Sequence, residues 1–298
     1  MKDGMEASIT EQKLWTSLSI INWSTDYLAS KDIDSPRLTC ELLLARVLRC
    51  SRIDLYTKFD RPLLQEELIQ FKLLFKRRLL REPLQYILAE TEFMGLKFNV
   101  DRRVLIPRPE TEIVVEQVIA LAKRTPLAYI LDIGTGSGNI AISLATCLDK
   151  CEIDAVDVSS EALEVARHNL ELHRCGRRVN LIQCDVLQED LMLPRERYDL
   201  IVSNPPYISQ AEFRSLQVEV RDFEPMIATT DGADGLKYYH AIADIGKRYL
   251  VQGGWIVVEH AYNQSDAVRS LFFDTGYSDI EITYDYTGTP RVVKARWL

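Results

Sequence analysis

Apolar side chains recur at every third or fourth position between positions 1 and 83, the spacing of an α-helix with one buried face. In the first predicted helix these positions are Leu14, Leu18, Ile21 and Leu28. A second helix is predicted after Pro36 and a third after Pro62, because the first helical turn tolerates the missing N–H of proline. Three such helices predict a small bundle, so we expect residues 1–83 to form a separate helical domain.

From residue 84 onwards the helical spacing gives way to short apolar segments. The segments 86–88 and 96–100 have the composition of strands, and Met94-Gly95 between them is a turn sequence. We therefore expect residues 84–106 to form a β-hairpin linker.

Residues 107–298 alternate apolar strands with helices. The first five predicted strands are 128–133, 152–158, 179–184, 198–203 and 254–260, and helices are predicted at 138–148 and 160–173. This alternation is typical of a parallel sheet that helices cover on both faces. Residues 280–284 and 291–295 flank a Thr-Gly-Thr-Pro turn and predict a terminal antiparallel hairpin. The expected fold is α/β, with a doubly wound, mostly parallel seven-stranded sheet after the helical bundle and the β-hairpin linker.

Charge is spread unevenly along the 298 residues, whose formal net charge is −8. Residues 1–88 hold 14 Lys and Arg against 12 Asp and Glu, and the remainder holds 22 against 32. An acidic larger domain has no general attraction for nucleic acid. We therefore expect no direct nucleic-acid partner.

The six cysteines and the absence of a long apolar stretch indicate the cellular compartment in which the protein is expected. No cysteines form a Cys-x-x-Cys pair, and no second pair or histidine cluster completes a zinc-like set. The sequence has no signal peptide and no apolar run of about 18 residues, the length that crosses a membrane. We expect a cytoplasmic, monomeric protein with no metal ion and no membrane partner.

A glycine-rich turn between the strand 128–133 and the next helix is the first candidate for ligand binding. It consists of Gly134, Thr135, Gly136, Ser137 and Gly138. Its Gly-x-Gly-x-Gly spacing differs from the Gly-x-Gly-x-x-Gly of dinucleotide sites, where a pyrophosphate lies on the helix N-terminus. Asp132 beside the turn would repel a pyrophosphate but suits a ligand that carries an ammonium and a sulfonium group. The alternative is a turn of purely structural purpose.

The next two strands also end in acidic residues. Asp157 is placed to accept hydrogen bonds from the hydroxyls of a ribose, although it could instead cap the helix that begins at Ser160. Asp185 can accept from an adenine amino group while Val186 packs against the ring, although an acid there could be a plain turn residue. Ligands of such sheets bind at the carboxyl ends of the strands, so the three strand ends support one another.

The segment Asn204-Pro205-Pro206-Tyr207 follows the strand 198–203 and indicates the reaction. A planar amide-type nitrogen is a poor nucleophile and needs acceptors that hold both of its N–H groups. The Asn204 oxygen and a backbone carbonyl, most simply that of Pro205, supply two acceptors, and Tyr207 offers a face for stacking. Such preorganised dipoles stabilise charge that develops in the transition state. A proline-stiffened turn without chemistry is the alternative.

The sequence resembles the protein-(glutamine-N5) methyltransferases that modify peptide chain release factors. The matching motifs are Arg81 to Ile87, Glu92 to Gly95, Ile106 to Glu112, the glycine loop, Asn204 to Ile208 and Arg221 to Pro225. The resemblance implies a methyltransferase sheet and S-adenosylmethionine as cofactor, held by Gly134 to Gly138, Asp157, Asp185, Val186 and Asn204. It also implies that Asn204, Pro205, Pro206 and Tyr207 hold the substrate glutamine and that the helical domain helps to grip the release factor.

Three other functions remain as alternatives. A sister group that methylates a glutamine of a ribosomal protein is similar, but Pro107 to Glu112 fits the release-factor group better. A DNA adenine-N6 methyltransferase uses a related loop, but it must flip a base and hold phosphates. A binding module without activity would have no need of the intact Asn204 loop. One departure from the family is Ala261, where glycine is frequent, and a positive φ there would cost about 1 kcal/mol.

Overall fold

The computed structural model describes residues 14–298, and the part of the predicted helical domain formed by residues 1–13 lies outside the described residues. The chain divides after Leu88 into two compact units, each with its own core. Among residues 14–298, every helix is too short or too polar to cross a bilayer.

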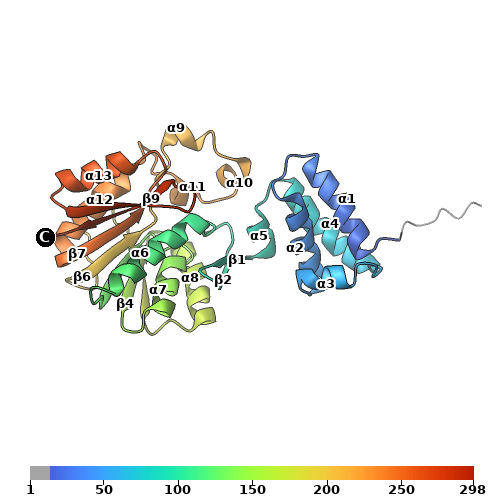
Figure 1. The fold of residues 1–298 in the computed structure, drawn as a ribbon, viewed down its shortest axis with the longest axis horizontal. Coiled ribbons are helices and arrows are strands. Elements are labelled where there is room, and N and C mark those ends of the chain that lie inside the picture. Colours follow the sequence, from blue (N-terminus) through green and yellow to red (C-terminus); the bar gives the residue numbers. More distant parts are fainter. Residues whose placement is uncertain (1–13) are drawn as a thin grey trace, which may run out of the picture. The chain divides into compact units, whose positions relative to one another are not determined.

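The first unit is helical (Figure 1). Its helices are α1 (Ser17–Ala29), α2 (Pro36–Leu48), α3 (Arg52–Thr57), α4 (Gln65–Leu79) and α5 (Leu84–Leu88). The three predicted helices are confirmed as α1, α2 and α4. Thr16 caps α1 through its side chain, and Pro36 occupies the first turn of α2. Leu28, Leu43 and Phe71 are almost fully buried between the helices.

The strand predicted at residues 86–88 is wrong, because these residues belong to α5. The backbone N–H groups of Tyr86 and Ile87 both donate to the Pro83 carbonyl, which closes a helical turn. Tyr86 and Ile87 are both buried, whereas neighbours in a strand point to opposite faces. A short apolar run fits a buried strand or a helical turn equally well, and here the turn after Pro83 decides.

The predicted hairpin forms slightly further along the chain. Strands β1 (Glu90–Phe93) and β2 (Leu96–Asn99) pair antiparallel around Met94 and Gly95, whose φ angles are +52° and +70°. Positive φ at both positions is the geometry of a two-residue turn that matches the twist of the strands. Asn169 exchanges hydrogen bonds of 2.7 and 3.0 Å with the Asn99 backbone, so the hairpin packs within the second unit.

The second unit is a seven-stranded sheet between two layers of helices, which confirms the predicted fold (Figure 1). The strands are β3 (Tyr129–Ile133), β4 (Glu152–Asp157), β5 (Val179–Gln183), β6 (Tyr198–Ser203), β7 (Leu250–Glu259), β8 (Ser278–Tyr284) and β9 (Pro290–Arg296). Their order is β5-β4-β3-β6-β7-β9-β8. The first five of this order run parallel, and the C-terminal β8 and β9 form the expected antiparallel hairpin.

Helices cover both faces of this sheet. The long ones are α6 (Glu112–Ala122), α7 (Asn139–Cys147), α8 (Ser160–His173), α12 (Lys237–Tyr249) and α13 (Ser265–Asp274). The short ones are η1 (Pro109–Thr111), α9 (Gln210–Phe213), α10 (Val218–Arg221) and α11 (Met226–Thr229). Figure 1 shows α6, α7 and α8 on one side of the sheet and α12 and α13 on the other.

Successive residues along a strand pack alternately into two apolar cores, one on each face of the sheet. Ile130 packs toward α6 and α7, whereas Leu131 packs toward α12 and α13. Ala155 and Val156 divide between the two cores in the same way. Burying one such Leu or Ile side chain contributes about 1.5–3 kcal/mol, so both faces fix the strand positions. The carboxyl ends of β3 to β7 therefore meet along one rigid edge.

Candidate active site

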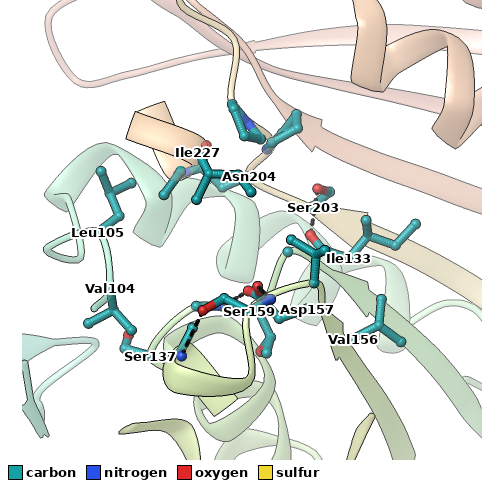
Figure 2. Close-up of a pocket in the computed structure, with 18 of the residues that line it drawn as sticks. Val104, Leu105, Ile133, Ser137, Val156, Asp157, Ser159, Ser203, Asn204 and Ile227 are labelled. Atoms are coloured by element: carbon teal, nitrogen blue, oxygen red, sulfur yellow. Dashed lines mark hydrogen bonds between the residues drawn. The ribbon is translucent and has the colours of Figure 1, made fainter. Parts of the chain in front are cut away.

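A pocket that is partly open to solvent lies in the second unit at the carboxyl ends of β3, β4, β5 and β6. The chain turns one way from β3 to β4 and β5 and the other way to β6 and β7, and ligands of such sheets bind where the order reverses. Residues 103–111 and 225–228 contribute the rest of the wall. Figure 2 shows Asp157 and Ser159 on one side of the space and Asn204 and Ile227 on the opposite side.

The structure places ten of the twelve residues predicted for the site in the wall of this pocket. They are Gly134, Thr135, Gly136, Ser137, Asp157, Asp185, Val186, Asn204, Pro205 and Pro206. The other two do not line this pocket. Gly138 is the N-cap of α7, and Tyr207 turns its hydroxyl toward Glu259. The pocket wall thus consists of segments that lie far apart in the sequence.

The glycine loop exposes backbone to the pocket. Gly134 and Gly136 have φ angles of +73° and +54°, and a Cβ at either position would meet no atom within 4 Å. The Gly134 and Thr135 N–H groups donate to the Val156 carbonyl, which anchors the loop to β4. Glycine permits this positive φ and leaves the space beside the backbone open for a ligand.

Asp132 supports the loop from behind and does not line the pocket, contrary to the expectation that its charge faces a ligand. The side chain is fully buried and accepts a hydrogen bond of 2.6 Å from the Thr135 hydroxyl. Burial raises the pKa of this carboxyl to about 7. Asp132 therefore acts on the shape of the loop.

Asp157 connects the glycine loop to α8. Its Oδ2 accepts from the Gly136 N–H and its Oδ1 from the Ser159 N–H, both at 2.9 Å. Ser159, not Asp157, caps α8, because its hydroxyl accepts from the Ala162 N–H. Burial raises the pKa of the Asp157 carboxyl. A carboxylate has about four acceptor positions, so those that the backbone leaves open are available to a ligand in the pocket.

The segment after β5 contributes Asp185 and Val186 to the pocket wall, and α12 contributes Tyr238. Asp185 Oδ1 accepts from the Leu187 N–H at 3.0 Å, so it also holds the turn. Sequence reasoning missed Tyr238, whose burial raises the pKa of its hydroxyl. It lies beside the fully buried core residue Tyr239, and the sequence alone does not separate a pocket tyrosine from a core tyrosine.

The Asn204 loop leaves β6 in a fixed orientation. The Ser203 hydroxyl donates to the Ile133 carbonyl at 2.7 Å, which joins β6 to β3 at this edge (Figure 2). Asn204 Nδ2 donates to Thr111 Oγ1 at 3.0 Å. Within residues 14–298 the Asn204 side-chain oxygen accepts no hydrogen bond, so it is left as an acceptor at the pocket.

Tyr207 anchors the end of the same loop. Its hydroxyl donates to Glu259 Oε1 at 3.1 Å, and its carbonyl accepts from Gln264 Nε2 at 2.9 Å. The backbone passes so close to Gly235 that a Cβ there would lie 2.4 Å from the Tyr207 carbonyl oxygen. Contacts from β7 and from the residues just before α12 and α13 therefore hold the loop.

Two sequence motifs meet at the pocket through one ion pair. Arg108 contacts Glu224 at 2.5 Å, and the Ile106 N–H donates to the same carboxylate at 3.3 Å. Glu224 is buried, which raises its pKa, and the nearby guanidinium opposes this rise. The pair joins the segment before α6 to the segment before α11, and sequence reasoning did not foresee it.

Ala261 does not have the positive φ that its frequent replacement by glycine would suggest. Its N–H donates to Gln264 Oε1 at 3.2 Å, and the same Gln264 side chain holds the Tyr207 carbonyl. The backbone cost considered for alanine at this position therefore does not arise.

Metal-binding side chains are dispersed in the part of the chain that the structure describes. All six cysteines there are free thiols. In residues 14–298 no three His, Cys, Asp or Glu side chains come together in a group that could hold a metal ion.

Comparisons with known proteins agree over most of the chain. Residues 19–88 match the family model of the PrmC N-terminal domain, and residues 111–221 match that of the Methyltransferase small domain. The release factor glutamine methyltransferase of Geobacter sulfurreducens is 43% identical over 95% of this chain and 98% of its own length. The enzyme of the same name from Chlorobaculum tepidum is 39% identical, over 94% of this chain and 97% of its own.

Solved structures share the fold at much lower identity. The hMettl16 catalytic domain, solved with an RNA hairpin, has a TM-score of 0.55 at 17% identity and covers 92% of this chain and 91% of its own. A methyltransferase from Pyrococcus furiosus has a TM-score of 0.50 at 18% identity, over 77% of this chain and 98% of its own. These two likenesses concern the fold alone. The full-length relatives decide the family: the chain belongs to the release factor glutamine methyltransferases and is an enzyme that uses S-adenosylmethionine as its cofactor.

Proposed function

We propose that the protein transfers a methyl group from S-adenosylmethionine to the side-chain nitrogen (N5) of the glutamine in the Gly-Gly-Gln loop of peptide chain release factors, and so modulates translation termination. The observation that carries the proposal is the orientation of Asn204. Its Nδ2 is bound to Thr111, and its oxygen remains an acceptor at the pocket. Full-length relatives with this substrate in their names support the choice of glutamine.

The Asn204 loop provides what an amide nitrogen needs to react. The nitrogen lone pair is delocalised into the carbonyl group, so attack on a methyl group requires acceptors for its two N–H groups. Asn204 Oδ1 is one acceptor, and we assign the Pro205 carbonyl as the second. Both residues line the pocket, and the two prolines keep the loop rigid. Fixed acceptors stabilise the positive charge that develops on nitrogen without a reorganisation cost.

Tyr207 holds this loop, and its ring is the proposed surface for the flat amide. Its buried hydroxyl is bound to Glu259, so the ring has one fixed position. Pro206 beside it lines the pocket. We propose that Pro206 and Tyr207 limit the space for the substrate to a planar group.

The pocket suits the cofactor. S-adenosylmethionine supplies an activated methyl group on a sulfonium centre. We propose that Asp157 accepts from the ribose hydroxyls, that Asp185 accepts from the adenine amino group, and that Val186 packs on the adenine ring. The open space beside Gly134 and Gly136 gives the ligand access to the loop backbone.

We propose that the helical domain, residues 1–83, recognises the release factor and that residues 84–106 connect it to the methyltransferase domain at 107–298. Trp23 and Tyr27 on α1 are 45% and 39% exposed, and their rings stack at 5.5 Å. Exposed aromatic side chains are typical of protein interfaces. We also propose a monomer that acts in the cytoplasm, where translation takes place.

The test is transfer of labelled methyl from S-adenosylmethionine to four substrates. These are a purified release factor, the same protein with its loop glutamine changed to alanine, the glutamine-containing ribosomal protein, and duplex DNA. Label is expected on the intact release factor alone, with mass spectrometry locating it on the loop glutamine. Equal label on the Gln→Ala protein, or preferential label on the ribosomal protein or DNA, would refute the proposal.

A further inference from the structure

A buried carboxyl group lies behind the Asn204 loop at the end of β7. Glu259 is 2% exposed, and its Oε1 accepts from the Tyr207 hydroxyl at 3.1 Å. Its Oε2 is buried and has no hydrogen bond of standard geometry among the described residues. The Thr111 hydroxyl is near enough to lower the pKa of this carboxyl through hydrogen bonding. The Tyr207 hydroxyl thus occupies one oxygen of this carboxylate, and the other oxygen is a buried acceptor without a partner among the described residues.

The hydroxyl of Thr111 still has its own proton to donate after it binds Asn204. Thr111 Oγ1 accepts from Asn204 Nδ2 at 3.0 Å, so its single proton must be donated elsewhere. An ionised carboxylate only accepts hydrogen bonds, and Glu259 is therefore the natural recipient of that proton. With the Thr111 proton committed to Glu259, only the NH₂ end of the Asn204 carboxamide fits against Thr111.

We propose that Glu259 is a positioning residue that acts through Thr111 to hold the Asn204 carboxamide with its oxygen toward the substrate nitrogen. This inference rests on the proposed function, because it assumes that Asn204 binds the amide that is methylated. A protonated or amide side chain at position 259 donates to Thr111 and lets Thr111 donate to Asn204. The carboxamide then rotates by half a turn and presents NH₂ to the substrate NH₂.

The backbone of β7 does not require a carboxyl group at this position, and the one hydrogen bond of standard geometry that the carboxyl group makes is to the Tyr207 hydroxyl. The β7 backbone is held by β6 and β9, and the Tyr239 hydroxyl donates to the Glu259 backbone carbonyl, not to its side chain. Burying a charge is unfavourable, and a well-packed apolar side chain is often no less stable. The carboxyl group is therefore better explained by its effect on its two hydroxyl neighbours.

The groups around Glu259 shift the pKa of its carboxyl in opposite directions. The ionisable groups around it are Glu110, Tyr207, Tyr239 and Arg291. Burial raises the pKa of Glu259 to about 7, Glu110 adds to the rise, and Thr111, Tyr207 and Arg291 oppose it. Since the ionised form orients Asn204, turnover should fall as the pH decreases through this pKa.

The first experiment compares Glu259→Gln with the wild-type enzyme on whole release factor. We expect kcat to fall at least about tenfold, up to the roughly 10²-fold expected for loss of the Asn204 acceptor. The Kd of S-adenosylmethionine should stay within about twofold of the wild-type value. Loss of one good hydrogen bond to the cofactor would change the Kd about tenfold, so a change within about twofold indicates that cofactor binding is intact. The acid limb of the wild-type pH profile of kcat should be absent in Glu259→Gln.

Asp154→Asn is the matched control for a lost buried charge. Asp154 is 1% exposed and also accepts from a tyrosine hydroxyl, that of Tyr198, at 2.8 Å. It does not line the pocket. This variant should lower the melting temperature while the acid limb of the pH profile remains. If it abolishes the limb as Glu259→Gln does, the limb reports general stability and the inference is wrong.

Thr111→Val and Thr111→Ser test the same coupling between Glu259 and Asn204 without changing the charge at position 259. Valine keeps the shape of threonine but removes the hydroxyl, so kcat should fall as in Glu259→Gln, and serine should restore most of it. A serine variant no better than the valine variant would contradict the inference. This pair decides the matter even if Glu259→Gln fails to fold.

A double-mutant cycle separates action through Asn204 from independent action. In an Asn204→Ala background, Glu259→Gln should cause no further loss of kcat, because the group it orients is gone. Multiplied losses would overturn the inference. If the wild-type enzyme does not methylate the release-factor glutamine at all, the proposed function fails instead; if it does and Glu259→Gln is equally active at every pH, only this inference fails.

Discussion

Asp157 is a carboxylate that the backbone orients before any ligand binds. Two N–H groups, from Gly136 and Ser159, fix its position, and its remaining acceptor positions are available to the pocket. Fixing an acceptor in advance lowers the entropy lost when a ligand binds. The same logic applies to Asn204, which Thr111 holds in place before a substrate arrives.

Replacing Asp157 with Ala should weaken the binding of S-adenosylmethionine by about 1.5–3 kcal/mol, since hydrogen bonds to a charged group are lost. Isothermal calorimetry measures this directly. Glu161→Ala, at an exposed position of α8, is the control for the change in net charge and should leave the affinity as it is. An unchanged Kd in Asp157→Ala would rule out the ribose contact.

Replacing Asn204 with Ala should lower turnover by about 10²-fold or more, because an acceptor that acts in the transition state is removed. Affinity for S-adenosylmethionine and the melting temperature should change little. Asn204→Asp keeps an acceptor oxygen and should be more active than Asn204→Ala. Rapid single-turnover kinetics gives the rates, and a near-normal rate in the alanine variant would show that the acceptor is another group.

At the scale of elements, the loop after β6 is held by residues next to helices that come much later in the chain. Gln264 at the start of α13 binds the Tyr207 carbonyl, and Gly235 before α12 lies against the same oxygen. The shape of the catalytic loop therefore depends on packing between segments that are distant in the sequence. Substitution of a single glycine tests this dependence.

Gly235→Ala should disturb the Asn204 loop, whereas Gly232→Ala should not. Both glycines have positive φ, +88° and +72°, so alanine costs about 1 kcal/mol of backbone strain at either position. Only at Gly235 would the new Cβ also meet the Tyr207 carbonyl, at 2.4 Å. We expect both a lower kcat and a lower melting temperature in Gly235→Ala than in Gly232→Ala, with kcat measured at a temperature where both variants are folded. Equal kcat values would show that the loop tolerates the displacement.

Patterns that one element determines were predictable from the sequence, and relations between elements were not. The strand, glycine turn and helix at 128–148 are local, so apolar spacing and glycine placement predict them. The short segment 86–88 was misassigned because three apolar residues satisfy two periodicities. The contact of Thr111 with Asn204 joins residues 93 positions apart, and only the packing of the finished sheet brings them together.

At the scale of the whole molecule, the pocket and the helical bundle belong to different units. The pocket consists entirely of residues from the second unit, and the first unit has its own apolar core. We therefore expect cofactor binding to need no side chain of the first unit. A Gly-Gly-Gln tripeptide offers far less surface than a typical stable interface buries, so selective binding needs contacts elsewhere.

Whole release factor should therefore be a far better substrate than a Gly-Gly-Gln peptide, and deletion of residues 1–83 should remove most of that advantage. The deletion variant should still bind S-adenosylmethionine with near wild-type affinity, because every pocket residue remains.

Trp23→Ser in the full chain is a smaller change that tests the same recognition surface, since this exposed side chain stacks on Tyr27. It should raise the KM for release factor while the KM for the peptide stays the same. The kcat/KM ratio of release factor to peptide, measured for the three proteins, is the deciding quantity. A ratio that is unchanged by the deletion would place release-factor recognition on the second unit, and a deletion variant that no longer binds the cofactor would show that the second unit needs the first to fold.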